Sequence, residues 1–336
     1  MTCTRKFVLN QDLLDASDKP RHVGGGSNCQ HALEKSEFNK MKLKRAHEEI
    51  PKFLDMENIL PALNKQPFKF LFPLLERFTG ITWLNKQTDV LCRRYASDIC
   101  ASVLEVFPYL NISHHVSMPS ENPITKPGGK IIVANHEGFL LDGLFLGWML
   151  NQHRSDFKFI ATSDISCSPY TKSCFFLDTS LRHSKNPGRN LALYRKVIRW
   201  LKEEKVIVIF PGTHAEKKMS WLNERQFPWS NLPYSLAKKA NVSIIPIKLN
   251  VPESCFFRAL RIGELFFYNI KMRRMTKVFE LLRGSFCCRQ IKYATEKTIS
   301  CIVGPELKPG MGEAQNNHLR DYVYQLRDCI PFTDEF

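Results

Sequence analysis

The chain has 336 residues, enough for a sizeable hydrophobic core in one or two domains. It carries 48 Lys and Arg against 33 Asp and Glu, and this net charge of +15 favours anionic partners such as phosphates, nucleic acid or an acidic bilayer surface. Hydrophobic residues make up 43% and charged residues 24%, a composition that excludes a mostly disordered, collagenous or multi-span membrane chain.

The cysteines indicate a reducing compartment, the cytoplasm. They number 11 and include no Cys-x-x-Cys pair, so they predict neither a complete disulfide framework nor a structural zinc site. The N-terminus has no apolar segment typical of a secretion signal. The most apolar stretch, Phe139 to Leu150, is interrupted by Asp142 and is too short to cross a bilayer. We therefore expect no secretion signal and no membrane span.

The first third of the chain differs from the rest in its pattern of polar and apolar residues. Residues 1–55 are polar and include Gly24-Gly25-Gly26 and several lysines, which predicts a flexible arm, either a solvated tail or a membrane-docking segment. Residues 56–125 carry apolar positions at helical spacing and predict a helical cap of two or three helices.

Short apolar runs alternate with helical patterns from residue 126 onward. The runs that predict strands are KIIVAN, FKFIAT, CFFLD, VIVIFPG, SIIPIKL and TISCIVG, and the helical patterns cover 139–152, 190–203, 230–240 and 272–283. This alternation predicts an α/β fold class, with a mixed, largely parallel sheet flanked by helices over 126–310 and a closing helix within 311–336. Such sheets bind ligands at the carboxyl ends of their strands.

The first of these strands is followed by a histidine and an acid. It ends at Ala134 and runs into Asn135-His136-Glu137-Gly138, and Asp142 follows within an apolar helix. A buried carboxylate needs a partner, and Gly138 gives the loop the freedom to bring His136 to it. An imidazole held by a carboxylate on one nitrogen can take a proton from a hydroxyl with the other. A helix cap and a surface ion pair are the alternatives.

Two further clusters follow later strands. Asp178 ends one strand with Arg182 close behind, a pair that suits either an anionic substrate group or a strand-end ion pair. Phe210-Pro211-Gly212-Thr213-His214 ends another, where backbone N–H groups, a hydroxyl and nearby cations suit a phosphate or a developing oxyanion. A plain strand-ending turn explains this second cluster equally well.

In order and spacing, these clusters resemble the motifs of the glycerolipid and lysophospholipid acyltransferase superfamily. Its members carry Asn-His with a following Asp, a Phe-Ile-Asp-Arg-like block, Phe-Pro-Glu-Gly-Thr-Arg, and an apolar strand with Pro, which Ile244-Ile245-Pro246-Ile247-Lys248 matches here. Five residues separate His136 from Asp142, where the superfamily usually has four. Asp142-Gly143 is similar to the ending found in the haemolysin-like branch, which includes ornithine-lipid acyltransferase-like proteins. The resemblance covers roughly 120–310.

The third block departs from the superfamily pattern at two points. It lacks the Glu and has His214 in place of the Arg, and Thr179 stands where the second block commonly has Arg. These departures affect the recognition of the acceptor more than the chemistry.

The resemblance implies transfer of a fatty acyl group from acyl-CoA or acyl carrier protein to a hydroxyl of a lysolipid or polyol-phosphate acceptor. It implies that His136 is the general base and that Asp142 stabilises the imidazolium, with no acyl-enzyme, no metal and no organic cofactor. The residues that it implies for substrate binding are Asn135, Arg182, Gly212, Thr213 and His214.

The stretch from Cys255 to Gly284 mixes aromatic and basic residues, which suits either contact with an anionic membrane or core packing with a solvated basic face. We therefore expect a cytoplasmic protein with peripheral membrane association and an anionic membrane surface as partner. The alternative is a non-catalytic lipid-binding protein with a degenerate acyltransferase fold. We expect no nucleic acid partner, because no nucleic-acid-binding motif accompanies the charge.

Overall fold

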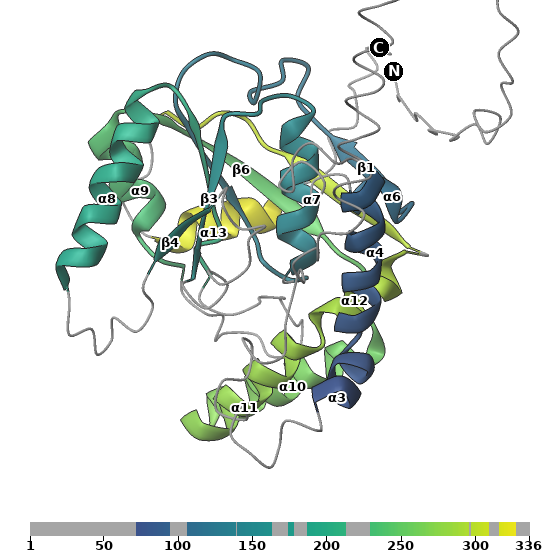
Figure 1. The fold of residues 1–336 in the computed structure, drawn as a ribbon. Coiled ribbons are helices and arrows are strands. Elements are labelled where there is room, and N and C mark those ends of the chain that lie inside the picture. Colours follow the sequence, from purple (N-terminus) through teal and green to yellow (C-terminus); the bar gives the residue numbers. More distant parts are fainter. Residues whose placement is uncertain are drawn as a thin grey trace, which may run out of the picture. The chain divides into compact units, whose positions relative to one another are not determined.

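A seven-stranded sheet forms the centre of the computed structural model, which describes residues 72–94, 106–138, 140–162, 174–177, 187–212, 229–295, 297–308 and 316–326 (Figure 1). The strand order is β1-β7-β6-β2-β5-β3-β4. The strands are β1 (Ser113–Ser117), β2 (Lys130–Ala134), β3 (Phe157–Thr162), β4 (Cys174–Leu177), β5 (Val206–Ile209), β6 (Ser243–Asn250) and β7 (Thr298–Val303).

The sheet is mixed and largely parallel. Strands β6, β2, β5, β3 and β4 run in one direction, β7 pairs antiparallel with β6, and β1 pairs parallel with β7. Strand β2 lies between β5 and β6 and is buried along its whole length. The predicted α/β fold class is confirmed.

The six apolar runs of the sequence all form strands of this sheet, and the structure adds β1. Its sequence, Ser-His-His-Val-Ser, is polar and mostly exposed, because β1 lies at the edge of the sheet. It falls in the range 56–125 that the sequence predicts to be helical. The division into domains stays a prediction, and the arm over 1–55 lies outside the described residues.

Helices cover both faces of the sheet, because alternate residues of each strand point to opposite faces. Ile132 and Ala134 of β2 belong to one hydrophobic cluster, and Ile131 and Val133 belong to the other. The helices of the first cluster are α3 (Phe72–Thr79), α4 (Ile81–Arg94), α6 (Val106–Tyr109), α7 (Leu140–Asn151) and α12 (Cys287–Ala294). Those of the second are α8 (Pro187–Lys202), α9 (Leu232–Ala240) and α13 (Asn316–Gln325).

A pair of helices, α10 (Cys255–Asn269) and α11 (Arg273–Ser285), follows β6 and precedes α12 (Figure 1). None of the helices in the described ranges is both long and apolar enough to cross a membrane.

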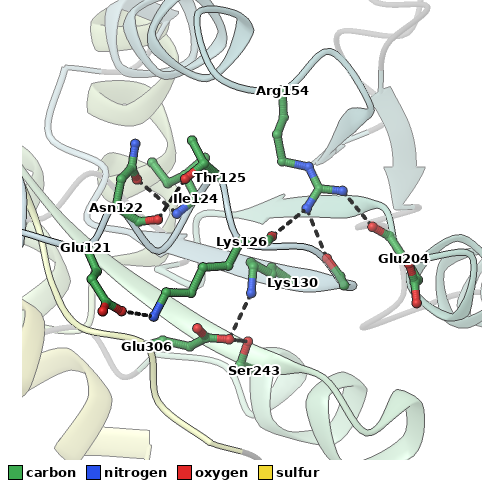
Figure 2. Close-up of polar contacts among 11 residues, drawn as sticks. Glu121, Asn122, Ile124, Thr125, Lys126, Lys130, Arg154, Glu204, Ser243 and Glu306 are labelled. Carbon is green, nitrogen blue, oxygen red and sulfur yellow. Dashed lines mark hydrogen bonds and ion pairs between the residues drawn. The ribbon is translucent and has the colours of Figure 1, made fainter.

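Charged side chains join the amino ends of the central strands (Figure 2). Lys130, the first residue of β2, is only 3% exposed and donates to the Glu306 carboxylate at 2.8 Å. Ser243, the first residue of β6, also donates to Glu306. Arg154 binds Asp156 and donates to the carbonyl oxygens of Lys126, Gly128 and Glu204. Ion pairs and caps therefore occupy this end of the sheet.

Lys248 links the centre of the sheet to the last described helix. Its Nζ donates to the carbonyl oxygens of Tyr324, at 3.0 Å, and Leu326, at 2.8 Å. These carbonyls lie at the C-terminus of α13, where a helix has acceptors without intrahelical partners and a partial negative charge. The lysine therefore fixes α13 to β6.

We predict that Glu306→Gln lowers the free energy of unfolding by about 2 kcal/mol at neutral pH, because it leaves the buried Lys130 ammonium without its carboxylate. Burial raises the pKa of Glu306, but hydrogen bonds from Lys130 and Ser243 and the charges of Lys130 and Lys126 outweigh it. The net pKa therefore lies below the ordinary 4.5.

A depressed pKa stabilises the fold above pH 4.5, and this contribution is lost as pH falls through the lowered folded-state value. Urea unfolding from neutral to acidic pH measures this. The difference between wild type and variant should be full at neutral pH and shrink below pH 4.5. A constant difference across that range would contradict this account.

Candidate active site

The loop after β2 is fixed by the side chain of Asn135, which is 1% exposed. Asn135 Nδ2 donates to the carbonyl oxygen of Leu249 at 2.8 Å, and the N–H of Leu249 donates back to Oδ1 at 2.7 Å. The amide thus continues the pairing of β2 with β6 one residue beyond Ala134. Asn135 therefore positions the loop that carries His136, and its predicted contact with substrate stays a prediction.

His136 and Asp142 are in direct contact. The imidazole Nδ1 lies 3.0 Å from Asp142 Oδ2, and the side chains are 26% and 0% exposed. Since a carboxylate oxygen only accepts, Nδ1 carries the hydrogen of this bond and the basic lone pair lies on Nε2. The arrangement differs from a surface ion pair, because the carboxylate is buried in the first turn of α7.

Gly138 completes the surroundings of the carboxylate. Its N–H donates to Asp142 Oδ2 at 2.8 Å, as a helix cap would. A Cβ at this position would lie 2.7 Å from Asp142 Oδ1 and 2.8 Å from Val251 Cγ1. Only glycine allows this approach. The reason is steric and differs from the backbone freedom that the sequence predicts, because Gly138 is not among the described glycines with a positive φ. Among the described residues, no donor reaches Oδ1.

Phe210 packs on the face of the imidazole, a contact that the sequence did not reveal. The ring centroids of His136 and Phe210 are 4.5 Å apart and the planes meet at 26°. Strand β2 pairs with β5 so that Val133 lies opposite Ile209, and Phe210 directly follows Ile209. The sequence does place Phe210 directly after a buried strand. Its contact with His136 could not be predicted, because the sequence does not show that β2 and β5 are neighbours.

The same pairing brings the third block of the sequence to the histidine. His136 and Gly212 each stand three residues beyond the pair Val133 and Ile209, so the two segments leave the same edge of the sheet side by side. Gly212 is half-buried. Thr213, His214 and Arg182 lie outside the described residues, and their predicted roles stay predictions.

This geometry can perform general-base chemistry. The Asp142 carboxylate holds the ring through Nδ1 and stabilises the imidazolium once Nε2 has taken a proton. Stacking on Phe210 and the hydrogen bond to Asp142 together fix the orientation of the ring. The pair lies at the carboxyl end of the central strand, where a parallel sheet binds its ligands.

The family model described as Acyltransferase matches residues 115–250, from within β1 to the end of β6. These residues belong to the acyltransferase family. The match includes the His136 loop, Asp142 and the Phe210 segment, and it confirms the expected superfamily, while the narrower branch stays a prediction. Helices α10, α11 and α12 follow the matched residues in the chain.

Among solved structures, the chain is similar to the crystal structure of the 1-acyl-sn-glycerophosphate (LPA) acyltransferase PlsC from Thermotoga maritima. The two share 14% sequence identity with a TM-score of 0.42, over 76% of this chain and 94% of that one. Comparison of the sequence with curated proteins finds no match.

We predict that Gly138→Ala and Gly143→Ala change stability in opposite directions. The first introduces a Cβ against Asp142 and Val251 and should destabilise the protein by about 1–3 kcal/mol. The second adds a Cβ in α7 that meets nothing within 4 Å, and should stabilise it by up to about 1 kcal/mol. Urea unfolding of both variants measures this, and equal effects would contradict the close approach of Gly138 to the carboxylate.

Proposed function

We propose that this protein transfers a fatty acyl group from a thioester, acyl-CoA or acyl carrier protein, to a hydroxyl of a lysolipid or glycerol-phosphate-like acceptor. The observation that carries the proposal is the contact of His136 with the fully buried carboxylate of Asp142, at the carboxyl end of β2 and within the acyltransferase domain. The proposed chemistry draws on no metal and no organic cofactor.

In the proposed reaction, Nε2 of His136 takes the proton of the acceptor hydroxyl while its oxygen attacks the thioester carbonyl carbon. The tetrahedral intermediate collapses, the carbon–sulfur bond breaks, and the imidazolium returns the proton to the leaving thiolate. An ester and a free thiol result, without an acyl-enzyme. Asp142 stabilises the imidazolium between these two steps.

Donors near the turn after β5 would stabilise the oxyanion or bind an acceptor phosphate. Gly212 is the described residue of this turn, and its segment leaves the sheet beside that of His136. Thr213, His214 and Arg182 complete the proposed substrate-binding set, and Asn135 supports it through the loop that it holds.

We further propose that the acceptor resides in an anionic membrane that the protein approaches from the cytoplasm as a peripheral protein. The net charge of +15 supports this, since each basic residue near an acidic bilayer contributes on the order of 1 kcal/mol before screening. Phospholipid biosynthesis is the class of metabolism that fits such an acceptor.

His136→Ala should lower kcat on the order of 10²–10⁴-fold, because it removes the proposed base and little packing. His115→Ala, which removes an exposed histidine of the edge strand β1, is the matched control and should keep wild-type turnover. The measurement is transfer of a radiolabelled acyl group from acyl-CoA or acyl carrier protein to a panel of lysolipids. Wild-type turnover in folded His136→Ala would end the proposed mechanism.

Asp142→Asn should lower kcat by roughly 10³-fold or more, since an amide does not stabilise the imidazolium as a carboxylate does. Asp156→Asn breaks the ion pair with Arg154 at the opposite end of the sheet and serves as the control. Acyl transfer by Asp142→Asn at the wild-type rate would show that Asp142 has a structural role only. If the wild type binds lipid without turnover, the protein is instead a non-catalytic lipid-binding protein. The missing Glu of the third block is the observation that favours this alternative.

A further inference from the structure

The hairpin formed by α10, α11 and their connecting turn exposes large apolar side chains. Single exposed apolar residues are ordinary on a protein surface, but here they gather on one supersecondary unit. Between 38% and 56% of each remains accessible, and the residues are Phe256, Phe266, Tyr268, Ile270, Met272, Val278 and Leu282. On α11, Arg274, Val278 and Leu282 follow at intervals of four and so form one exposed stripe.

The hairpin is nonetheless firmly held on its inner side. Arg283 of α11 lies 2.8 Å from the Glu264 carboxylate of α10, and both side chains are buried. A Cβ at Gly263 would lie 2.3 Å from the ring of Phe279, so the two helices approach closely at this glycine. The exposed apolar residues therefore belong to a packed unit with a defined outer surface.

The tip of the hairpin presents its side chains from a tight turn. Lys271, two residues after the end of α10, lies in the left-handed region at φ 59°. The N–H of Lys271 donates to the carbonyl of Tyr268 at 3.0 Å, and that of Met272 to Phe267 at 2.9 Å, the bonds of a Schellman motif. Tyr268, Ile270, Lys271 and Met272 are all exposed at this turn.

Basic residues accompany the apolar ones along this part of the chain. Residues 255–294 contain nine Lys and Arg against two Glu, and one of these, Glu264, already pairs with Arg283. The exposed cations among the described side chains are Arg258, Lys271, Arg274, Arg289 and Lys292. Exposed apolar groups together with exposed cations match the boundary of an anionic bilayer, where acyl chains meet acidic headgroups.

Helix α3 extends this surface. Phe286 packs against Phe78 of α3 at 5.4 Å and against Phe256 of α10 at 4.9 Å between ring centroids. Phe78 is 57% exposed and Leu74 of the same helix is 64% exposed. The apolar patch therefore runs from α3 over the start of α10, and Figure 1 shows these helices together beyond one end of the sheet.

We infer that the outer surface of α3, α10 and α11 is the membrane-docking surface of this protein, and that its partner is an anionic lipid bilayer. A second copy of the chain fits less well, since a symmetric contact would set the cations of one hairpin against those of the other. A nucleic acid would match the charge and leave the apolar side chains in water.

The docking surface begins beside the catalytic loop. Val251, directly after β6, is the residue that approaches Gly138, and α10 starts only four residues later. A bilayer held by this surface would therefore lie near the loop that carries His136. This step rests on the proposed function, because it makes the docked membrane the source of the acyl acceptor.

Vesicle sedimentation tests the surface directly. The wild type should bind vesicles of phosphatidylcholine mixed with phosphatidylglycerol, bind pure phosphatidylcholine weakly, and be released by high salt. Two variants, Ile270→Ser/Met272→Ser and Lys271→Glu/Arg274→Glu, should each weaken binding to the acidic vesicles roughly tenfold or more. All of these residues are exposed, so circular dichroism and thermal unfolding should match the wild type.

Matched controls separate the hairpin from general charge and hydrophobicity. Lys202→Glu/Lys239→Glu makes the same change in net charge on exposed positions of α8 and α9, and Leu191→Ser removes an apolar side chain that is 52% exposed on α8. Both should bind acidic vesicles as the wild type does within about twofold. Equal loss in the control and in the hairpin charge variant would overturn the assignment of the surface.

The test remains valid if the proposed chemistry fails. His136→Ala should bind vesicles like the wild type, and the hairpin variants should keep transfer to a monomeric short-chain acceptor while losing transfer to an acceptor in vesicles. Binding to neutral and acidic vesicles alike, wild-type binding by both hairpin variants, or a solution dimer that these variants dissociate would overturn the inference.

Discussion

A carboxylate with no exposure to solvent is the constraint around which this molecule is arranged. An ionised group in such a place is stable only when hydrogen bonds and a positive or polarisable partner replace water. Asp142 obtains them from His136 and from the N–H of Gly138. Each of these contacts has its own requirement, since Gly138 must lack a side chain and the loop must be held by Asn135 against Leu249. The position of β2 between β5 and β6 meets these requirements together.

Under the proposed function, acyl transfer and membrane docking fall to adjacent parts of the chain. The family match ends at residue 250, and the hairpin begins five residues later at Cys255. Only the short segment around Val251 connects them, and that segment touches the glycine on which the buried carboxylate depends. Val251 therefore lies between the base of the hairpin and the surroundings of Asp142.

Much of this fold could be predicted from the sequence, because its strands are uninterrupted apolar runs. The run FKFIAT coincides with β3, β4 takes up the first four residues of CFFLD, and the runs for β2 and β6 differ from their strands by one residue. Strand β1 could not be predicted, since an edge strand needs no apolar run and Ser-His-His-Val-Ser has none. For the site, the pairing of His136 with Asp142 followed from the need to neutralise a charge among leucines. The stacking of His136 on Phe210 could not be predicted, because it depends on the order of the strands in the sheet, and the local sequence pattern does not reveal that order.

The bonds from Lys248 to the last turn of α13 determine how far the folded unit extends. The family match stops at residue 250, yet the ammonium of Lys248 finds its described acceptors only at residues 324 and 326. A chain cut back to the matched region would leave a half-buried cation without acceptors in the strand that also anchors Asn135. Expression of the family-matched part alone therefore has to retain α13, and a fusion or cleavage tag is better attached beyond it than within it.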